Sequence, residues 1–348
     1  MTIPVQSDAF TPRHILVAGG AGFIGSAFVR SSLARYPEVK ITVLDKLTYA
    51  GNLDNLAPIA HQQGYRFVRG DITRPDDVTA ALDGCDALVN FAAETHVDRS
   101  ILDAGAFVST DVYGSYVLLE AVKTLGVARA LFVSTDEVYG DVEHGASVES
   151  DPFAPRSPYA ASKAGGEMLI RSYYITHGLP VLVTRGSNTY GPYHYPEKLI
   201  PLMTTNALDG LPLPVYGDGR QRRDWLHVDD HAAGIDAVLR RGALGEAYNL
   251  GGGAERENID VVTAILDAVG KPRSLMTYVQ DRAGHDRRYA LDSSKARALG
   301  WAPLHPFEQG LRETVEWYRT HQEWWRPLKS GEYAAYYATQ YAERLTKA

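Results

Sequence analysis

The sequence predicts an α/β protein, in which a Rossmann-type, doubly wound parallel sheet is joined to a smaller C-terminal domain. Two observations lead to this fold class. Short apolar runs alternate with stretches of helical spacing through the first half of the chain, as in a parallel sheet whose crossovers are helices. A glycine-rich turn also lies between the first apolar run and the first helical pattern. The chain has 348 residues, which is enough for one large domain and a smaller one.

The glycine-rich turn predicts a dinucleotide site. The first strand is expected at His14 to Ala18, and it leads into Gly19 to Gly25, which reads GGAGFIG. Such glycines let the backbone turn tightly and approach a pyrophosphate at the positive end of the next helix. The second strand, Ile41 to Leu44, ends at Asp45, and an acid there can bind both ribose hydroxyls and would repel a 2′-phosphate. NAD is therefore predicted in preference to NADP.

Two further strands bring suitable residues to the same edge of the sheet. A strand at Tyr65 to Val68 precedes Asp71, whose carboxylate could meet the adenine amino group. A strand at Ala87 to Phe91 precedes Ala92-Ala93, and such small residues leave room for a cofactor. Because ligands of these sheets bind outside the carboxyl ends of the strands, both segments are expected to line one crevice.

The fifth strand, Ala130 to Ser134, is followed by residues that predict chemistry. Thr135, Asp136 and Glu137 come directly after it, and Tyr159 and Lys163 begin the next helix. Residues four apart lie on one helix face, and a lysine near a phenol favours its ionised form, so Tyr159 is a candidate base. Adjacent carboxylates whose pKa values are separated could supply an acid and a second base.

Beyond the sixth strand, Pro180 to Thr184, the alternation is less regular. Strands are predicted at residues 213–216 and 221–227, with a return to the sheet at residues 247–250, and the remainder is expected to be helical around the loop at residues 281–286. In the segment VDDH at residues 228–231 we expect an acid that caps the helix over residues 231–241. No metal ligand is therefore predicted.

The composition excludes several classes of protein. The net charge is −7, so nucleic acid is not an expected partner. The single cysteine, Cys85, rules out an internal disulfide and a thiolate metal cage, and it fits a cytoplasmic protein. Residues 1–13 lack the features of a secretory signal and are expected to form a loose leader. No apolar run approaches the roughly 18 residues that span a membrane, so no membrane partner is expected.

Taken together, the motifs resemble those of a known family. The glycine turn and Tyr159-x-x-x-Lys163 are similar to the extended short-chain dehydrogenase/reductase superfamily. More narrowly, the chain from about His14 to Trp325 resembles the dTDP-glucose 4,6-dehydratases, through the segments STDEVYG, AAETHVDRS, YGPYHYPEKLIP, YGDGRQRRDWLHVDDH, YNLGGG and DRAGHDRRY. Related epimerases share the glycines and the Tyr-Lys pair but typically lack the Asp-Glu pair.

The resemblance implies a reaction and a domain organisation. dTDP-glucose would become the 4-keto-6-deoxy sugar and water by C4 oxidation, C5/C6 elimination and hydride return to C6, as a step of deoxysugar biosynthesis. Residues 12–190 plus 228–257 would bind NAD, and residues 191–227 plus 258–348 would bind the nucleotide sugar. A homodimer is expected, formed through two helices per subunit, one of which carries Tyr159 and Lys163.

The resemblance also implies roles for individual residues. Catalysis would fall to Thr135, Asp136, Glu137, Tyr159 and Lys163. NAD would contact Gly19, Gly22, Phe23, Ile24, Asp45, Lys46, Leu47, Thr48, Asp71, Ile72, Phe91, Ala92, Ala93, Thr110, Tyr159, Lys163 and Thr189. The nucleotide sugar would contact Thr95, Thr135, Asn188, Glu197, Lys198, Leu199, Pro214, Tyr216, Arg223, Asn249, Arg282 and His285.

Three positions differ from the residues that this family often has. Thr95 stands where serine is common, and Thr189 and Gln221 stand where asparagine is common. These differences leave the nucleotide preference open more than the reaction class. A UDP-glucose 4,6-dehydratase, a 5,6-dehydratase and an epimerase remain alternatives, whereas a non-catalytic dinucleotide sensor would be expected to have lost the tyrosine, the lysine or the acids.

Overall fold

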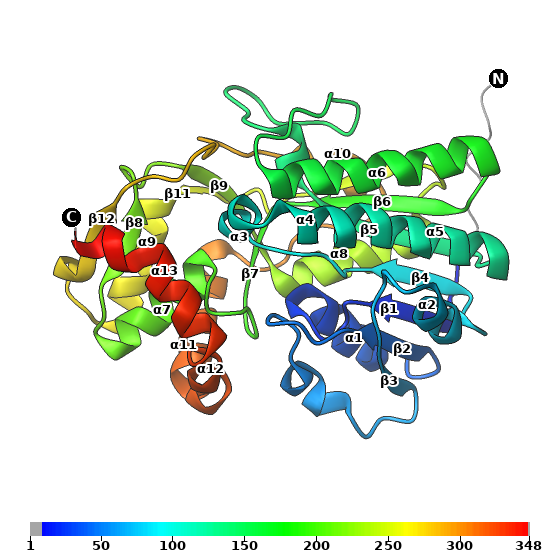
Figure 1. Cartoon of the computed structure of the whole chain (residues 1–348), viewed down its shortest axis with the longest axis horizontal. Coiled ribbons are helices and arrows are strands. Elements are labelled where there is room, and N and C mark those ends of the chain that lie inside the picture. The colour runs from blue at the N-terminus through cyan, green and yellow to red at the C-terminus, as the bar shows by residue number, and fades with distance from the viewer. Residues whose placement is uncertain (1–8, 347–348) are drawn as a thin grey trace.

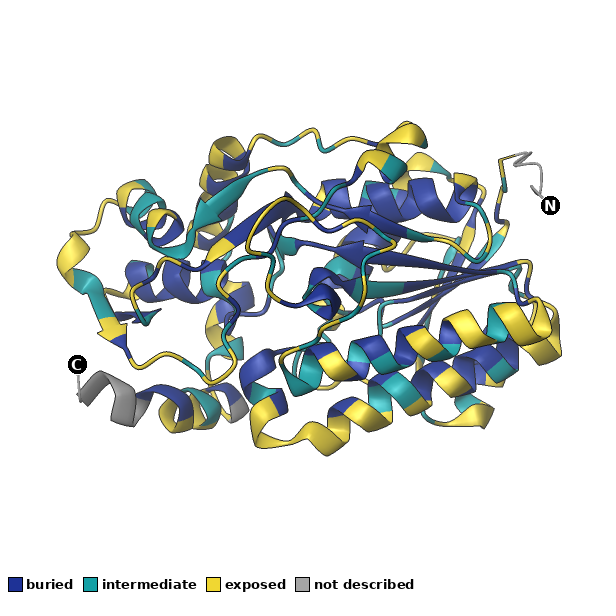
Figure 2. Ribbon diagram, turned by 90° about the horizontal axis from the view of Figure 1, so that it is seen from above, coloured by how far each residue is buried: buried dark blue, intermediate teal, exposed yellow. Residues whose placement is uncertain are grey.

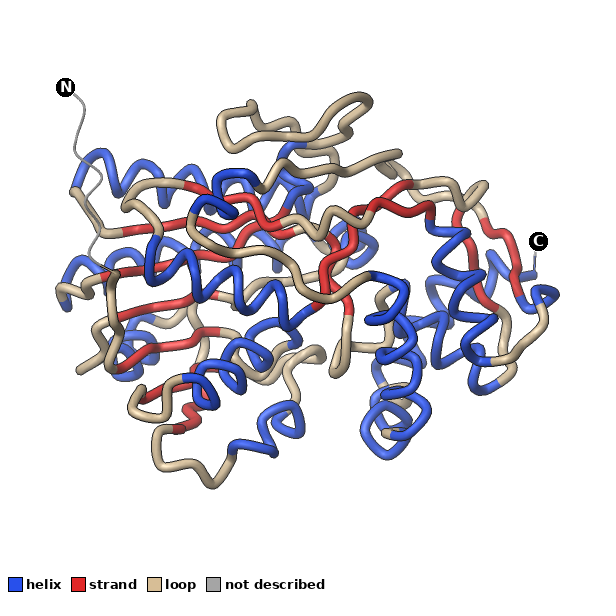
Figure 3. Tube along the Cα trace, turned by 180° about the vertical axis from the view of Figure 1, so that it is seen from behind, coloured by secondary structure: helices blue, strands red, loops and turns tan. Residues whose placement is uncertain are grey.

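The computed structural model describes residues 9–346, and its centre is a seven-stranded parallel sheet (Figures 1 and 3). The strand order is β10-β6-β5-β4-β1-β2-β3, with all neighbouring strands parallel. This order reverses between β1 and β4, which is where doubly wound sheets bind their ligands. The fold class is therefore confirmed. The strands are β1 (His14–Ala18), β2 (Lys40–Asp45), β3 (Tyr65–Arg69), β4 (Ala87–Asn90), β5 (Arg129–Thr135), β6 (Val181–Gly186) and β10 (Ala247–Leu250).

Helices cover both faces of the sheet, and successive strand residues pack on opposite faces. Ile15 and Val17 of β1 pack with helices α1 (Phe23–Arg35) and α8 (Val228–Arg241). Leu16 and Ala18 pack on the other face, with α2 (Pro75–Leu82), α5 (Gly114–Leu125) and α6 (Pro158–His177). Because both faces are buried, the strands read as continuous apolar runs, and Figure 2 shows them enclosed between helices with exposed outer faces.

A second group of elements lies beyond the carboxyl ends of the strands (Figure 1). It contains a parallel pair, β8 (Leu213–Tyr216) with β12 (Met276–Val279), and a three-stranded sheet of β7 (Asn188–Tyr190), β9 (Arg222–His227) and β11 (Glu255–Glu257). Its helices are α7 (Leu199–Asp209), α9 (Asn258–Val269), α11 (Phe307–Thr320), α12 (Gln322–Leu328) and α13 (Glu332–Thr346). The domain boundaries given above stay a prediction.

Short helices make up the connections. They are η1 (Leu53–Ile59), α3 (Val97–Leu102), α4 (Ala104–Phe107), the π-helix η2 (Val108–Tyr113), η3 (Asp136–Tyr139), η4 (Arg273–Leu275) and α10 (Ser294–Ala298). Among residues 9–346 no helix is both long and apolar enough to cross a membrane. Most of the expected leader, residues 1–8, lies outside the described part of the chain.

Two expectations about secondary structure were wrong. Strands β11 and β12 lie in the segment that was expected to be helical, because each is held by pairing with a strand distant in sequence. Helix α8 begins at Val228, and its N-cap is His227, whose side chain accepts the backbone N–H of Asp229. The acids of this segment therefore lie inside the first turn of the helix, where a negative charge interacts favourably with the helix dipole.

Candidate active site

In the glycine turn between β1 and α1, no side chain of the glycines covers the backbone where a ligand would bind. Gly19 has a φ of +74°, and a Cβ there would lie 2.4 Å from the backbone nitrogen of Ala92 at the end of β4. At the end of β2, the two carboxylate oxygens of Asp45 accept the backbone N–H groups of Ala21, at 2.9 Å, and Leu47, at 2.8 Å. Burial raises the pKa of Asp45, and these two hydrogen bonds lower it.

One pocket runs along this edge of the sheet and contains nearly every residue assigned to the cofactor. Lys46 forms an ion pair with Asp71 at 2.7 Å on its rim. Leu47 is the exception, because its side chain packs against the apolar core beneath the turn. The assigned residues that line the pocket are Gly19, Gly22, Phe23, Ile24, Asp45, Lys46, Thr48, Asp71, Ile72, Phe91, Ala92, Ala93, Thr110, Tyr159, Lys163 and Thr189.

The five residues assigned to catalysis line the same pocket. Thr135 ends β5, and its hydroxyl lies 3.2 Å from the Asp136 carboxylate and accepts the Glu137 backbone N–H at 3.3 Å. Tyr159 and Lys163 lie in the first turns of α6, which begins at a proline and is capped by a serine side chain. β5 ends at the crevice and α6 begins there, so residues that are far apart in the sequence meet at this place.

Asp136 is buried and Glu137 is half-buried, and the charges around the two carboxyl groups differ. Burial and the neighbouring Glu137 charge raise the pKa of Asp136 well above its usual range. Burial also raises the pKa of Glu137, whereas Arg282, Arg223 and Lys198 lower it. The pKa values of both acids are thus raised, and the nearby cations make Glu137 the more readily ionised of the two. Within the described part of the chain, Oδ2 of Asp136 is buried without a hydrogen-bond partner.

The groups around Tyr159 shift its pKa in opposite directions. Burial and the charges of Glu137 and Asp111 raise its pKa well above the usual value, although a hydrogen bond with Thr135 lowers it. The ammonium group of Lys163 donates to the backbone carbonyl of Val133 at 2.7 Å. An ionised Tyr159 would therefore depend on a positive charge in the cofactor pocket in addition to that of Lys163.

A second pocket opens from the first and contains most residues assigned to the substrate. Glu137, Asn188, Glu197 and Lys198 line both pockets and mark their junction. Thr95 lines the first pocket, and Lys198 donates to its hydroxyl at 3.0 Å. The assigned residues lining the second pocket are Asn188, Glu197, Lys198, Leu199, Pro214, Tyr216, Arg223, Arg282 and His285. The site thus joins a bare glycine turn, a carboxylate pair and a cationic cleft.

Comparison with known proteins identifies the family. The GDP-mannose 4,6 dehydratase family profile matches residues 16–314. A dTDP-glucose 4,6-dehydratase of Streptomyces niveus is 54% identical over 326 residues, covering 92% of this chain and 97% of that protein. The chain belongs to the dTDP-glucose 4,6-dehydratase family.

Solved structures agree with this assignment. The dTDP-glucose 4,6-dehydratase of Streptomyces venezuelae, solved with NAD and TYD bound, is 52% identical to this chain, and the two structures have a TM-score of 0.89. The match covers 91% of this chain and 100% of that one. The UDP-glucose 4-epimerase of Thermus thermophilus, solved with NAD, is 32% identical with a TM-score of 0.82, covering 88% and 99%. The fold is thus shared with epimerases, whereas the sequence identity to the dehydratase is higher than that to the epimerase.

Asn249, assigned to the substrate from the family resemblance, lies away from both pockets. Its side-chain amide donates to the Ser147 carbonyl at 2.9 Å and accepts from the Tyr139 hydroxyl at 2.8 Å, and Asn249 is fully buried within β10. Asn249 therefore does not line either pocket, and its assignment to the substrate stays a prediction. Asn258, at the start of α9, lines the second pocket, and its Oδ1 is buried without a partner among the described residues. Two asparagines nine residues apart could not be distinguished by sequence alone.

Other residues that line the two pockets were not predicted from the sequence. His194 stacks on Phe23 with ring centroids 4.0 Å apart and planes 7° apart, which places an aromatic wall beside the glycine turn. Tyr341 of α13 lines the second pocket from the far end of the chain. Neither residue belongs to a local spacing pattern, so only long-range packing could reveal it.

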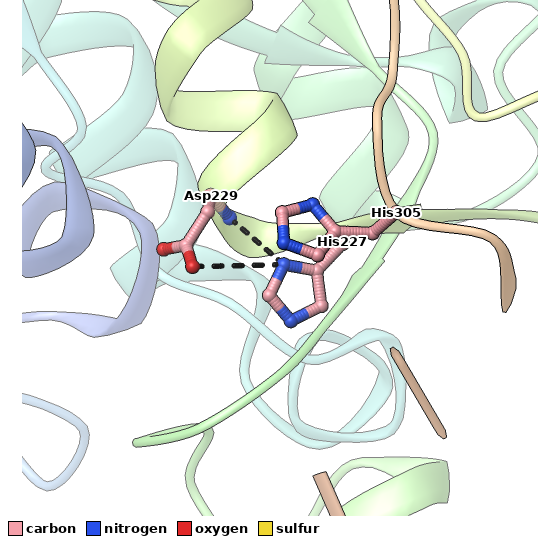
Figure 4. Close-up of side chains that lie close together, drawn as sticks. All are labelled: His227, Asp229 and His305. Atoms are coloured by element: carbon pink, nitrogen blue, oxygen red, sulfur yellow. Dashed lines mark hydrogen bonds and ion pairs between the residues drawn. The ribbon is translucent and has the colours of Figure 1, made fainter. Parts of the chain in front are cut away.

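Among the described residues, one group of side chains has donor atoms close enough to one another to hold a metal ion. Atoms of His227, Asp229 and His305 lie within 4.8 Å of one another (Figure 4). The two imidazole rings stack, with 4.2 Å between centroids and 26° between planes, so their in-plane lone pairs run side by side and do not converge. Nδ1 of His305 also pairs with Asp230 at 2.9 Å. We therefore interpret this group as the cap of α8.

Proposed function

We propose that the protein is an NAD-dependent dTDP-glucose 4,6-dehydratase, which converts dTDP-glucose to dTDP-4-keto-6-deoxyglucose and water in deoxysugar biosynthesis. The observation that carries this proposal is the pair of Asp136 and Glu137 in one pocket with Tyr159. Removal of water needs an acid for the departing hydroxyl and a base for the neighbouring proton, and this pair can supply both.

The residues at the glycine turn fit NAD. A side chain at Gly19 would collide with the backbone of Ala92, so the turn stays open to a pyrophosphate. Each carboxylate oxygen of Asp45 accepts one backbone hydrogen bond and keeps capacity for a ribose hydroxyl. When bound, NAD supplies a hydride acceptor for C4 of the sugar and returns that hydride to C6.

The residues of the chain carry the proton transfers. Thr135 hydrogen-bonds the sugar O4, and Tyr159 takes the O4 proton. Tyr159 needs a further positive charge to ionise, and an oxidised nicotinamide carries one. The resulting C4 ketone acidifies the C5 hydrogen, which Glu137 removes. Asp136, whose protonated form burial favours, gives its proton to the C6 hydroxyl, which departs as water. The proton held by Glu137 then returns to C5 as hydride returns to C6.

The substrate would lie across the junction of the two pockets. Glu137 and Asn188 line both pockets, so the sugar is expected there. Arg223 and Arg282 line the second pocket beside Lys198, and their charges suit a diphosphate. This arrangement supports a nucleoside diphosphate sugar, with the nucleoside towards Pro214 to Tyr216.

Incubation with dTDP-glucose and mass spectrometry of the product tests the proposal. A product lighter by one water supports it, and a product of unchanged mass with galacto configuration would indicate a 4-epimerase instead. Competition among dTDP-, UDP- and GDP-glucose separates the nucleotide alternatives. Faster turnover of UDP-glucose would replace the dTDP assignment while keeping the reaction.

The proposal includes an assembly and a location. We infer a homodimer formed through α5 and α6. Side chains on these helices and the preceding η2 support it, because Tyr113, Tyr116, Met168 and Ile175 are apolar and exposed. The cytoplasmic location expected from the single cysteine remains part of the proposal.

A further inference from the structure

Helix α13, the red C-terminal helix of Figure 1, lies beyond residues 16–314, where the family profile matches. Its Tyr341 is only 4% exposed and lines the second pocket opposite β8. A tyrosine whose hydroxyl is buried usually finds a hydrogen-bond partner, and the phenol oxygen of Tyr341 lies 3.3 Å from that of Tyr216. The last helix of the chain therefore supplies part of the pocket wall.

Tyr216 is held from two sides. Its hydroxyl donates to the Asp98 carboxylate at 3.2 Å and accepts from the Gln340 amide at 2.8 Å. The rings of Tyr216 and Tyr341 are 6.1 Å apart with 32° between their planes. Asp98 belongs to α3 of the larger sheet domain, whereas Gln340 and Tyr341 belong to α13. Helix α13 therefore contributes directly to the orientation of Tyr216.

A second set of contacts ties α13 to α3 and to His96, the residue before α3. The Arg99 guanidinium carbon lies 4.4 Å from the Tyr336 ring centroid and 3.7 Å from that of Tyr49, and its Nε donates to Glu197 at 2.9 Å. Tyr336 also lies 3.3 Å from Nδ1 of His96. His96 has a φ of +128°, which is costly for a residue with a side chain and persists only where neighbours hold it.

We propose that α13 forms the wall at the nucleoside end of the substrate pocket, with Tyr341 as a positioning residue that orients Tyr216 against the nucleoside. This inference rests on the proposed function, because it assigns the nucleoside to that end. Glu137 marks the sugar end, and Arg223 and Arg282 suit the diphosphate. Among the other lining residues, Tyr216 and Tyr341 offer aromatic faces and hydroxyls that suit a base and a ribose.

The test compares Tyr341→Phe and Tyr341→Ala with the full-length protein. We expect the KM for dTDP-glucose and the inhibition constant of dTDP to rise by up to about tenfold in Tyr341→Phe, which loses one buried hydrogen bond, and further in Tyr341→Ala. We expect kcat to stay within about twofold, because Tyr341 lines only the pocket that lacks Asp136 and Tyr159. Thr339→Ala, at an exposed position of the same helix, is the matched control and should change neither constant.

Inhibition by inorganic pyrophosphate separates positioning from general loosening. A positioning role at the nucleoside end weakens dTDP inhibition and leaves pyrophosphate inhibition unchanged. Equal losses for both inhibitors, or an unchanged KM in Tyr341→Ala, would overturn the inference while wild-type dehydration stands. If the wild type neither dehydrates dTDP-glucose nor is inhibited by dTDP, the proposed function fails, and the inference fails with it.

Discussion

Asp136 is the residue whose surroundings bear most directly on the reaction. Replacement by asparagine removes the proton donor and keeps the shape, so Asp136→Asn should slow water loss by roughly 100- to 10,000-fold. Glu137 should still exchange the C5 hydrogen in that variant. The measurement is mass spectrometry in heavy water, in which recovered dTDP-glucose should carry deuterium while little dehydrated product forms. Normal turnover in Asp136→Asn would remove Asp136 from its role.

A second buried carboxylate, Asp111 in η2, predicts a pH dependence of stability. Its hydroxyl partner is Ser162 at 2.6 Å, and burial raises its pKa from 3.8 to about 6. Between these two values the folded state binds more protons than the unfolded state, so its contribution to the unfolding free energy falls as pH rises from about 4 to about 6. Above that window, ionised Asp111 costs on the order of 2–3 kcal/mol.

Asp111→Asn removes this titration. Its unfolding free energy minus that of the wild type should increase as pH rises through the same window and then level off, because the amide does not ionise. Urea denaturation at several pH values measures the difference. A difference that is constant or shrinks with rising pH would contradict the role assigned to Asp111.

At the scale of elements, a buried ion pair joins α6 to β6 beneath the catalytic turn. Arg185 and Glu167 have side chains 6% and 7% exposed, and Arg185 Nε donates to Glu167 at 2.9 Å. Arg185 also donates to the Tyr139 hydroxyl at the end of η3, which begins with Asp136. The pair therefore connects the helix that carries Tyr159 to the turn that carries the acids.

Glu167→Leu should lower the unfolding free energy by about 3–5 kcal/mol, because it leaves the Arg185 charge buried without its partner. Adding Arg185→Leu should recover part of this loss, since neither charge then remains. Chemical denaturation of the single and double variants measures both effects. A double variant less stable than Glu167→Leu would show that the other hydrogen bonds of Arg185 matter more than the pair.

At the scale of the whole molecule, the exposed apolar side chains of α5 and α6 bear on assembly. Met168 and Ile175 of α6 are 51% and 68% exposed. A charge placed in a buried apolar interface is costly, so Met168→Glu should dissociate the proposed homodimer. Size-exclusion chromatography with light scattering should then give half the wild-type mass. Leu304→Glu, at an 82% exposed position away from these helices, is the control and should leave the mass unchanged.

The sequence by itself determined the parts of this protein that depend on local patterns. Alternating apolar runs and helical spacing gave the strands and helices of the main sheet, because period and burial are linked along each element. The glycine turn and the order of Thr135, Asp136 and Glu137 after β5 likewise predicted one crevice, since parallel strands end on the same edge.

The tertiary structure alone decided which distant side chains meet. It placed Asn258 in the pocket and buried Asn249 within β10, packed Leu47 against the apolar core, and brought Tyr341 from α13 to Tyr216. Each outcome depends on a long-range neighbour that local spacing does not encode. Burial likewise raised the pKa values of Asp136 and of Tyr159, because the cost of a buried charge depends on every group packed around it.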